Sequence, residues 1–281
     1  MILFEDEFEK DRKYVSTNQE FLDLDEKLIE IRDFLNEFGY LTSNRDILII
    51  RRIGPVCSNI ILTSATKTLE SIRYCCINAN IADAYTLLRK YRDDLFYYLY
   101  LLAVADNSDF TRFVELEHLN EAEKNIWNWF NNQQKNLHIS SVLKYLATNK
   151  EIKKAIERFK LRDWFDRIGI KLNDFVHANG RVFYNKSYNR MVNEQNVKLL
   201  CEEFAQITVS ITVVFIFLIV IINPFLVMAN DYLDYLEFNE IPPEGSQHWV
   251  APFISDFLIK YISVLDENCI NYLRERTYME F

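Results

Sequence analysis

The sequence predicts an all-α protein, a bundle of long helices joined by short polar connections. The chain has 281 residues but only 5 Gly and 5 Pro, whereas sandwiches, barrels and doubly wound α/β folds need many turn residues. Its hydrophobic content of 49% supplies a large core and argues against disorder. Apolar residues also recur at helical spacing over most of the chain. We therefore expect a helical bundle with extra helices at both ends.

Residues 1–55 are predicted to form an N-terminal helical extension. Thr17 and Glu20 have the spacing of a capping box, and apolar residues follow at helical intervals. This helix is expected to end near Gly39, since Gly commonly follows the last helical turn. The segment Asp46–Ile53 fits either a short strand or the start of a helix, and both interpretations remain open.

Residues 56–229 are predicted to form the bundle itself. The predicted helices and helix starts are Ser58–Ala79, Asn80–Ala105, a capping box at Asn120 and Glu123, a start at Ser140 or Ser141, a capping box at Thr148 and Glu151, and Leu161–His177. The apolar stripe of the second helix is interrupted by Arg92, an unusual residue at a core position. A turn at Asn179-Gly180 is expected to end the last of these helices.

The most apolar segment is Ile207–Ala229, which has 23 residues and no charge. That length is sufficient for a helix to cross a membrane, and basic residues precede the segment while acidic residues follow it. A central helix buried in a bundle has the same composition. Polar residues in its first turns and Asn223-Pro224 near its end favour burial, but the sequence leaves both alternatives open.

Residues 230–281 are predicted to be a tail that packs on the bundle. Apolar residues between Trp249 and Ile262 recur at helical spacing, so this segment needs a core to cover its apolar face. The first ten residues are acidic and lack the pattern of a signal peptide. We therefore expect the protein in the cytoplasm, or at the cytoplasmic face of a membrane if Ile207–Ala229 spans it.

Composition excludes several classes of function. A net charge of −9 argues against a broad electrostatic grip on nucleic acid, although local basic patches remain available. The five cysteines are scattered and form neither a disulfide framework nor a zinc motif. The sequence also lacks the phosphate-binding loop, the serine-hydrolase elbow and the H-E-x-x-H zinc motif. We therefore expect no cofactor and no metal ion.

The candidate site combines residues from two predicted helices. Arg89 and Asp93 are four residues apart on one helix, and Asn173 and His177 are four residues apart on the other. An arginine that stabilises a phosphate and a histidine that transfers a proton suit cleavage of an RNA phosphodiester. A structural role remains open: an ion pair within one helix and a histidine that caps the other.

Two segments carry a resemblance to a known family. A-D-A-Y-T-L-L-R-K-Y-R-D-D (Ala82–Asp94) and K-L-N-D-F-V-H-A-N-G (Lys171–Gly180) resemble the HEPN superfamily, a group of small helical bundles found in bacterial toxins and phage-defence systems. Ribonuclease members of that superfamily use R-x-x-x-x-H, but Leu172 stands five residues before His177 here. If the chain is a nuclease, Arg89 or Arg92 must supply the missing cation.

The resemblance implies a HEPN-like defence or toxin-type effector of bacterial type. If it is an enzyme, it is a metal-independent endoribonuclease with RNA as its substrate. Many members of the superfamily lack nuclease activity, so the alternative is a non-enzymatic, membrane-anchored or partner-binding protein of a defence complex. Members of the superfamily often dimerise, so the expected partners also include a second copy of the chain.

Overall fold

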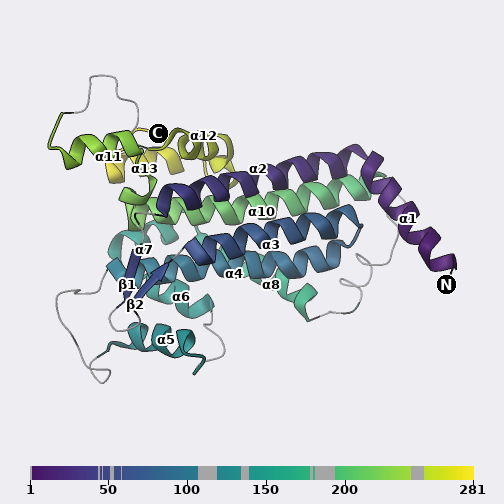
Figure 1. Ribbon diagram of the computed structural model, residues 1–281, viewed down its shortest axis with the longest axis horizontal. Helices are drawn as coiled ribbons and strands as arrows, with labels where there is room; N and C mark the ends of the chain where they lie inside the picture. Colours follow the sequence, from purple (N-terminus) through teal and green to yellow (C-terminus); the bar gives the residue numbers. More distant parts are fainter. Residues whose placement is uncertain are drawn as a thin grey trace.

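The structure is a computed structural model of the whole chain, shown in Figure 1. It describes residues 2–43, 45, 47–50, 54–57, 59–106, 119–133, 139–177, 180, 194–241 and 250–281. Within these ranges the protein is all-α except for one small hairpin, and the predicted fold class is confirmed. The hairpin pairs β1 (Ile47–Ile50) with β2 (Gly54–Cys57) in antiparallel register. Within the segment Asp46–Ile53, residues 47–50 therefore form a strand and not the start of a helix.

The helices expected from the sequence are present, together with helices that the sequence pattern did not predict. In chain order they are α1 (Ile2–Thr17), α2 (Gln19–Thr42), α3 (Asn59–Ile77), α4 (Ile81–Asp106), α5 (Glu121–Phe130), α6 (Ile139–Leu146), α7 (Lys150–Arg158), α8 (Leu161–Val176), α10 (Glu194–Ile222), the 3-10 turn η2 (Pro224–Val227), α11 (Asn230–Glu237), α12 (Pro252–Tyr261), the 3-10 turn η3 (Ile262–Val264) and α13 (Cys269–Thr277). The expected turn at Asn179-Gly180 lies mostly outside the described residues, and Gly180 has a φ of +49°.

The long helices α2, α3, α4 and α10 lie side by side and form the body of the bundle (Figure 1). Helix α2 packs on α3 and α10, and α4 packs on α3, α10 and α8. One hydrophobic core includes Leu28 from α2, Leu88 from α4 and Leu258 from α12. Residues from all three predicted parts of the chain, 1–55, 56–229 and 230–281, therefore contribute to one core.

Helix caps confirm one prediction and correct two. The capping box at Asn120 and Glu123 is present, with both reciprocal hydrogen bonds formed. The predicted caps Thr17 and Thr148 are wrong by one residue, because Asn18 and Asn149 cap α2 and α7 instead. An asparagine side chain accepts from free backbone N–H groups at a helix start as well as threonine does.

Thr17 has a different role because α1 continues up to it. Its hydroxyl donates to the carbonyl of Lys13, 2.9 Å away, as a residue inside a helix does.

The expected end of α2 at Gly39 is also wrong, since the helix continues to Thr42. Gly39 is buried where α2 meets α3, and a Cβ there would lie 3.6 Å from Asn59 Oδ1. That distance is an ordinary van der Waals contact, so Gly39 lies within the helix and neither ends it nor is required for this packing.

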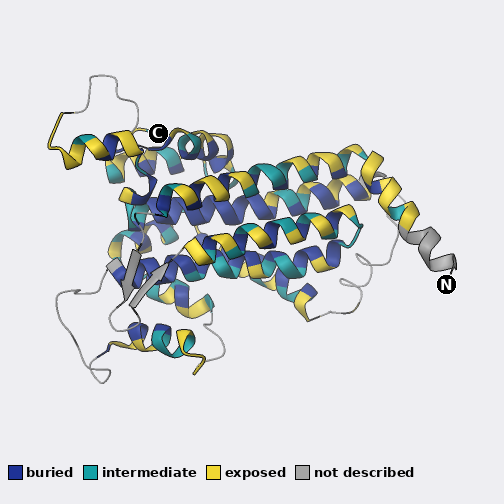
Figure 2. Cartoon of the chain, viewed as in Figure 1, coloured by how far each residue is buried: buried dark blue, intermediate teal, exposed yellow. Residues whose placement is uncertain are grey.

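The apolar segment forms most of α10. The helix begins earlier than predicted, at Glu194, and ends at Ile222 because Pro224 lacks the N–H needed to continue it. Residues 207–220 are buried throughout, and Figure 2 shows α10 buried along much of its length. In the described part of the chain, Asn196–Ile222 is the one helix long and apolar enough to cross a membrane. Its most apolar window is 83% buried by the rest of the protein.

Candidate functional site

Helices α4 and α8 pack against each other in antiparallel order. The rings of Tyr85 and Phe175 stack with centroids 4.2 Å apart, and those of Phe96 and Phe165 meet edge to face at 5.1 Å. Increasing residue numbers on α4 therefore correspond to decreasing numbers on α8. The two helices that carry the candidate residues therefore pack together.

Arg92 lies at the centre of this contact, and its surroundings explain a charge within an apolar stripe. The residue is only 4% exposed. Its Nε and Nη2 donate to Asp93 Oδ1 over 2.9 and 2.6 Å, and the guanidinium lies 5.1 Å from the centroid of Phe165. Gly169 of α8 lies against it, since a Cβ there would lie 3.4 Å from Nη1. Arg92 is thus held by one carboxylate and by the surface of α8.

Asp93 joins the two arginines of α4. The Nε of Arg89 lies 3.7 Å from Asp93 Oδ2, as expected for residues four apart on a helix. Burial raises the pKa of Asp93, although the charge and hydrogen bonds of Arg92 and the charge of Arg89 oppose this increase. The Nη1 of Arg92 has no hydrogen-bond partner among the described residues. Among the described residues, Asp93 is therefore the one carboxylate that pairs with both Arg89 and Arg92.

Asn173 and His177 continue the same edge of α8. Gly169, Asn173 and His177 are spaced by four residues, so they follow one another along the helix surface. His177 is exposed and ends α8, where its backbone N–H donates to the carbonyl of Asn173 over 3.0 Å. Eight residues separate Gly169 from His177, which is about 12 Å of helix. The imidazole therefore lies well along the helix from the guanidinium of Arg92.

The predicted site residues thus divide into two groups along one edge. Arg89, Arg92 and Asp93 form a contact cluster in the middle of α4, while Asn173 and His177 lie toward the end of α8. Because the helices are antiparallel, Arg89 is the arginine nearer to His177. No hydrogen bond or ion pair within the described ranges joins the imidazole to these residues. The pair of Arg89 with Asp93 and the position of His177 also fit the structural role considered above.

A further polar contact on α8 had no signal in the sequence. The ammonium of Lys171 pairs with Glu203 of α10 and lies 5.8 Å from the ring centroid of Tyr85. The hydroxyl of Tyr85 also donates to Glu203 over 3.2 Å. Burial lowers the pKa of Lys171. These residues lie far apart in the chain, so only the packing of three helices reveals the contact.

Comparison of the sequence and the structure with protein-family models, curated proteins and solved structures found no match. The function must therefore be inferred from the site itself. The resemblance to the HEPN superfamily stays a prediction that depends on the segments Ala82–Asp94 and Lys171–Gly180.

Proposed function

We propose that the protein is a HEPN-like defence or toxin-type effector of bacterial type that cleaves RNA without a metal ion. The main support is the antiparallel packing of α4 on α8, which brings together the helices that carry a partly exposed arginine, Arg89, and an exposed histidine, His177. Leu172, at the position where the family motif has arginine, is fully buried. The cation of the site therefore comes from α4, and Arg89 is its source.

The proposed reaction assigns a separate task to each residue. His177 removes the proton of a ribose 2′-hydroxyl, the 2′-oxygen attacks the adjacent phosphorus, and the bond from phosphorus to the 5′-oxygen breaks. The 5′-oxygen takes up a proton from solvent, and a 2′,3′-cyclic phosphate remains. Arg89 stabilises the negative charge that develops on the phosphate oxygens. Asp93 and the buried Arg92 position Arg89, and Asn173 positions the ribose or the phosphate.

The test replaces His177 with alanine. We expect RNA cleavage to decrease by about 100- to 10,000-fold, because the variant lacks the group that moves the proton. The measurement is total RNA integrity and growth on induction, followed by cleavage of a labelled RNA by the purified protein. Arg167→Ala is the matched control, since Arg167 is also exposed on α8. Full cleavage by a folded His177→Ala variant would reject the enzymatic proposal and favour the partner-binding alternative.

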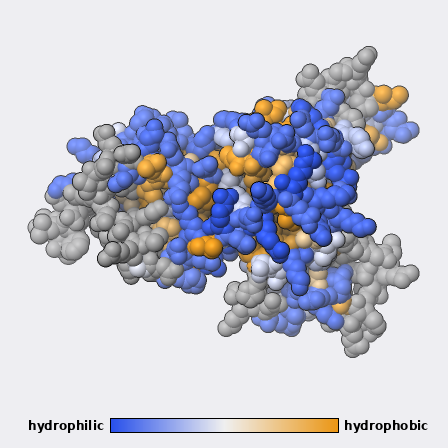
Figure 3. Space-filling model, turned by 180° about the vertical axis from the view of Figure 1, so that it is seen from behind, coloured by the Kyte–Doolittle hydropathy of each residue, from blue (hydrophilic) through white to orange (hydrophobic). Residues whose placement is uncertain are grey.

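We also propose that α10 is the core helix of a cytoplasmic protein and not a membrane anchor. Its polar side chains are bonded inside the bundle: the hydroxyls of Tyr91 and Thr212 lie 2.7 Å apart, and the indole of Trp164 donates to Ser210 over 3.3 Å. On the face drawn in Figure 3, hydrophobic residues form scattered patches among hydrophilic ones. A lipid-facing band would be continuous.

Cell fractionation tests this second proposal. We expect the full-length protein in the soluble fraction without detergent, because the apolar surface of α10 is already covered by neighbouring helices. The measurement is an immunoblot of soluble and membrane fractions before and after an alkaline wash. Protein that remains in the membrane pellet after the wash would contradict the proposal and favour the anchored alternative.

A further inference from the structure

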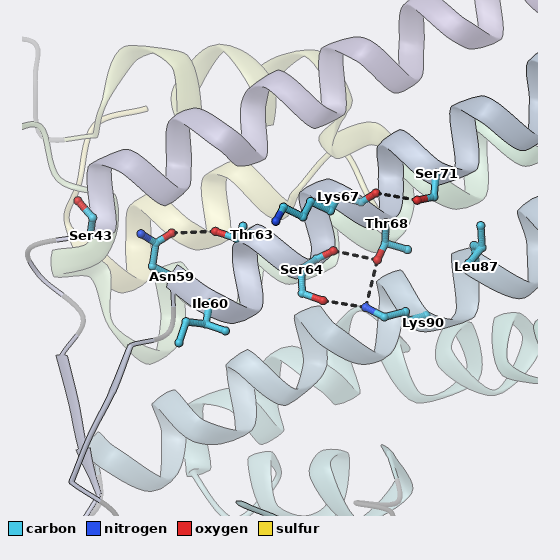
Figure 4. A pocket seen from close by; sticks show the side chains of 10 residues that line it. All are labelled: Ser43, Asn59, Ile60, Thr63, Ser64, Lys67, Thr68, Ser71, Leu87 and Lys90. Atoms are coloured by element: carbon cyan, nitrogen blue, oxygen red, sulfur yellow. Dashed lines mark hydrogen bonds between the residues drawn. The ribbon is translucent and has the colours of Figure 1, made fainter.

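The outer face of α3 is hollowed on both sides. A groove of about 740 Å³ lies between α3 and α4, and Figure 4 shows the polar side chains that line it. A second hollow of about 320 Å³ lies between α2 and α3. Asn59, Thr63 and Lys67 line both, so the two hollows meet along one row of α3. Together they form one continuous surface, lined by polar and apolar groups, that is separate from the edge of α4 and α8.

The two lysines of this surface differ in what they can bind. The ammonium of Lys90 donates to Ser64, Thr68 and Asp94 over 2.8, 3.1 and 2.5 Å, so its three protons are already used. Lys67 is exposed, and its ammonium has no partner among the described residues. The charge of Lys67 is therefore free to bind an anion.

An exposed aromatic ring lies on the other side of the same lysine. Tyr40 of α2 is 74% exposed and lines the second hollow together with Lys67. A flat ring next to a free cation is the combination that binds single-stranded RNA, because a base stacks on the ring while a phosphate contacts the cation. The amide groups of Asn36 and Asn59, which line the same hollow, can bond to base edges or to ribose hydroxyls.

We infer that the outer face of α3 binds a single strand of RNA outside the cleavage site, with a phosphate at Lys67 and a base on Tyr40. The inference rests on the proposed function and specifies where a further part of the substrate binds. Lys90 lines this groove and Arg89 precedes it on α4, so a strand that crosses α4 passes from the groove to the proposed site. With a net charge of −9 and few phosphate contacts, binding is expected to be weak and sensitive to salt.

The experiment measures binding apart from cleavage. The probe is a fluorescently labelled oligouridine with 2′-fluoro riboses, which cannot be cut by attack of a 2′-hydroxyl. Fluorescence anisotropy at several salt concentrations gives its affinity for the full-length protein. We expect Tyr40→Ala to weaken binding about tenfold through loss of stacking, and Lys67→Glu to weaken it about tenfold at low salt and to reduce the salt dependence. Lys153→Glu, at an exposed lysine of α7, is the control for the change in charge.

The outcomes separate this inference from the proposed cleavage. If Lys67→Glu and Tyr40→Ala bind the probe as tightly as the wild type, the groove is not a binding site, while cleavage dependent on His177 stands. If they bind weakly and wild type does not cleave ordinary RNA, the groove is supported and the cleavage proposal fails. Equal affinity of the wild type for a duplex of the same length, or no affinity for the single strand, would overturn the inference.

Discussion

Replacing Phe215 with alanine is expected to lower the free energy of unfolding by about 3–5 kcal/mol. Phe215 is fully buried in the C-terminal third of α10, where its ring meets those of Phe38 and Tyr98 edge to face, with centroids 6.0 and 5.5 Å away. Alanine would leave a cavity at the contact of α2, α4 and α10, since a packed interior cannot collapse fully around it. Urea denaturation followed by circular dichroism measures the change.

Leu199→Ala is the matched control for this prediction. Leu199 belongs to the same helix but is 58% exposed, so its truncation is expected to change stability by about 0.5 kcal/mol or less. Equal losses of stability from the two substitutions would mean that the side chain of Phe215 is not packed against neighbouring helices. That result would also weaken the proposal that α10 is a core helix.

Replacing Asp93 with asparagine is expected to destabilise the protein by about 3–5 kcal/mol, because it leaves the buried guanidinium of Arg92 without a counter-charge. Arg92 is nearly inaccessible to water, and Asp93 is the acceptor for both of its hydrogen bonds. Asparagine has the same size, so the substitution removes the charge without creating a cavity. Thermal and urea unfolding of the purified variant measure the loss.

A double variant separates the cost of an unpaired charge from general damage at this position. Arg92→Met together with Asp93→Asn removes both charges, and methionine can fill the space against Phe165 and Gly169. We expect the double variant to be more stable than Asp93→Asn alone, since replacing a buried ion pair with apolar groups is often close to neutral. A double variant as unstable as the single one would show that lost packing, and not charge, determines the effect.

Local patterns in the sequence predict much of the helical structure. The spacing of apolar residues places α3, α4 and α8 within about two residues of their observed ends, a normal uncertainty for helix boundaries. The capping box at Asn120 is also found, because its hydrogen bonds join residues three apart. The caps at Asn18 and Asn149 are missed because neighbouring threonine and asparagine compete for the same role, and the preceding turn decides between them.

The candidate site is predictable only in part. The four-residue spacings of Arg89 with Asp93 and of Asn173 with His177 can be read from the sequence because they lie within single helices. The burial of Arg92 against Gly169 and the pairing of Lys171 with Glu203 depend on which faces of separate helices meet. Nothing in the local pattern specifies those faces.

The sequence by itself determines that this protein is a helical bundle, because helical periodicity and the scarcity of turn residues are local properties. It does not determine whether α10 is covered by protein or by lipid, since both surroundings favour the same apolar residues. In the tertiary structure α2, α4 and the C-terminal helices cover α10, and its hydroxyl groups bond within the bundle. The same packing sets the distance between Arg92, on α4, and His177, at the end of α8. The distance between residues on two helices depends on the register in which the helices pack.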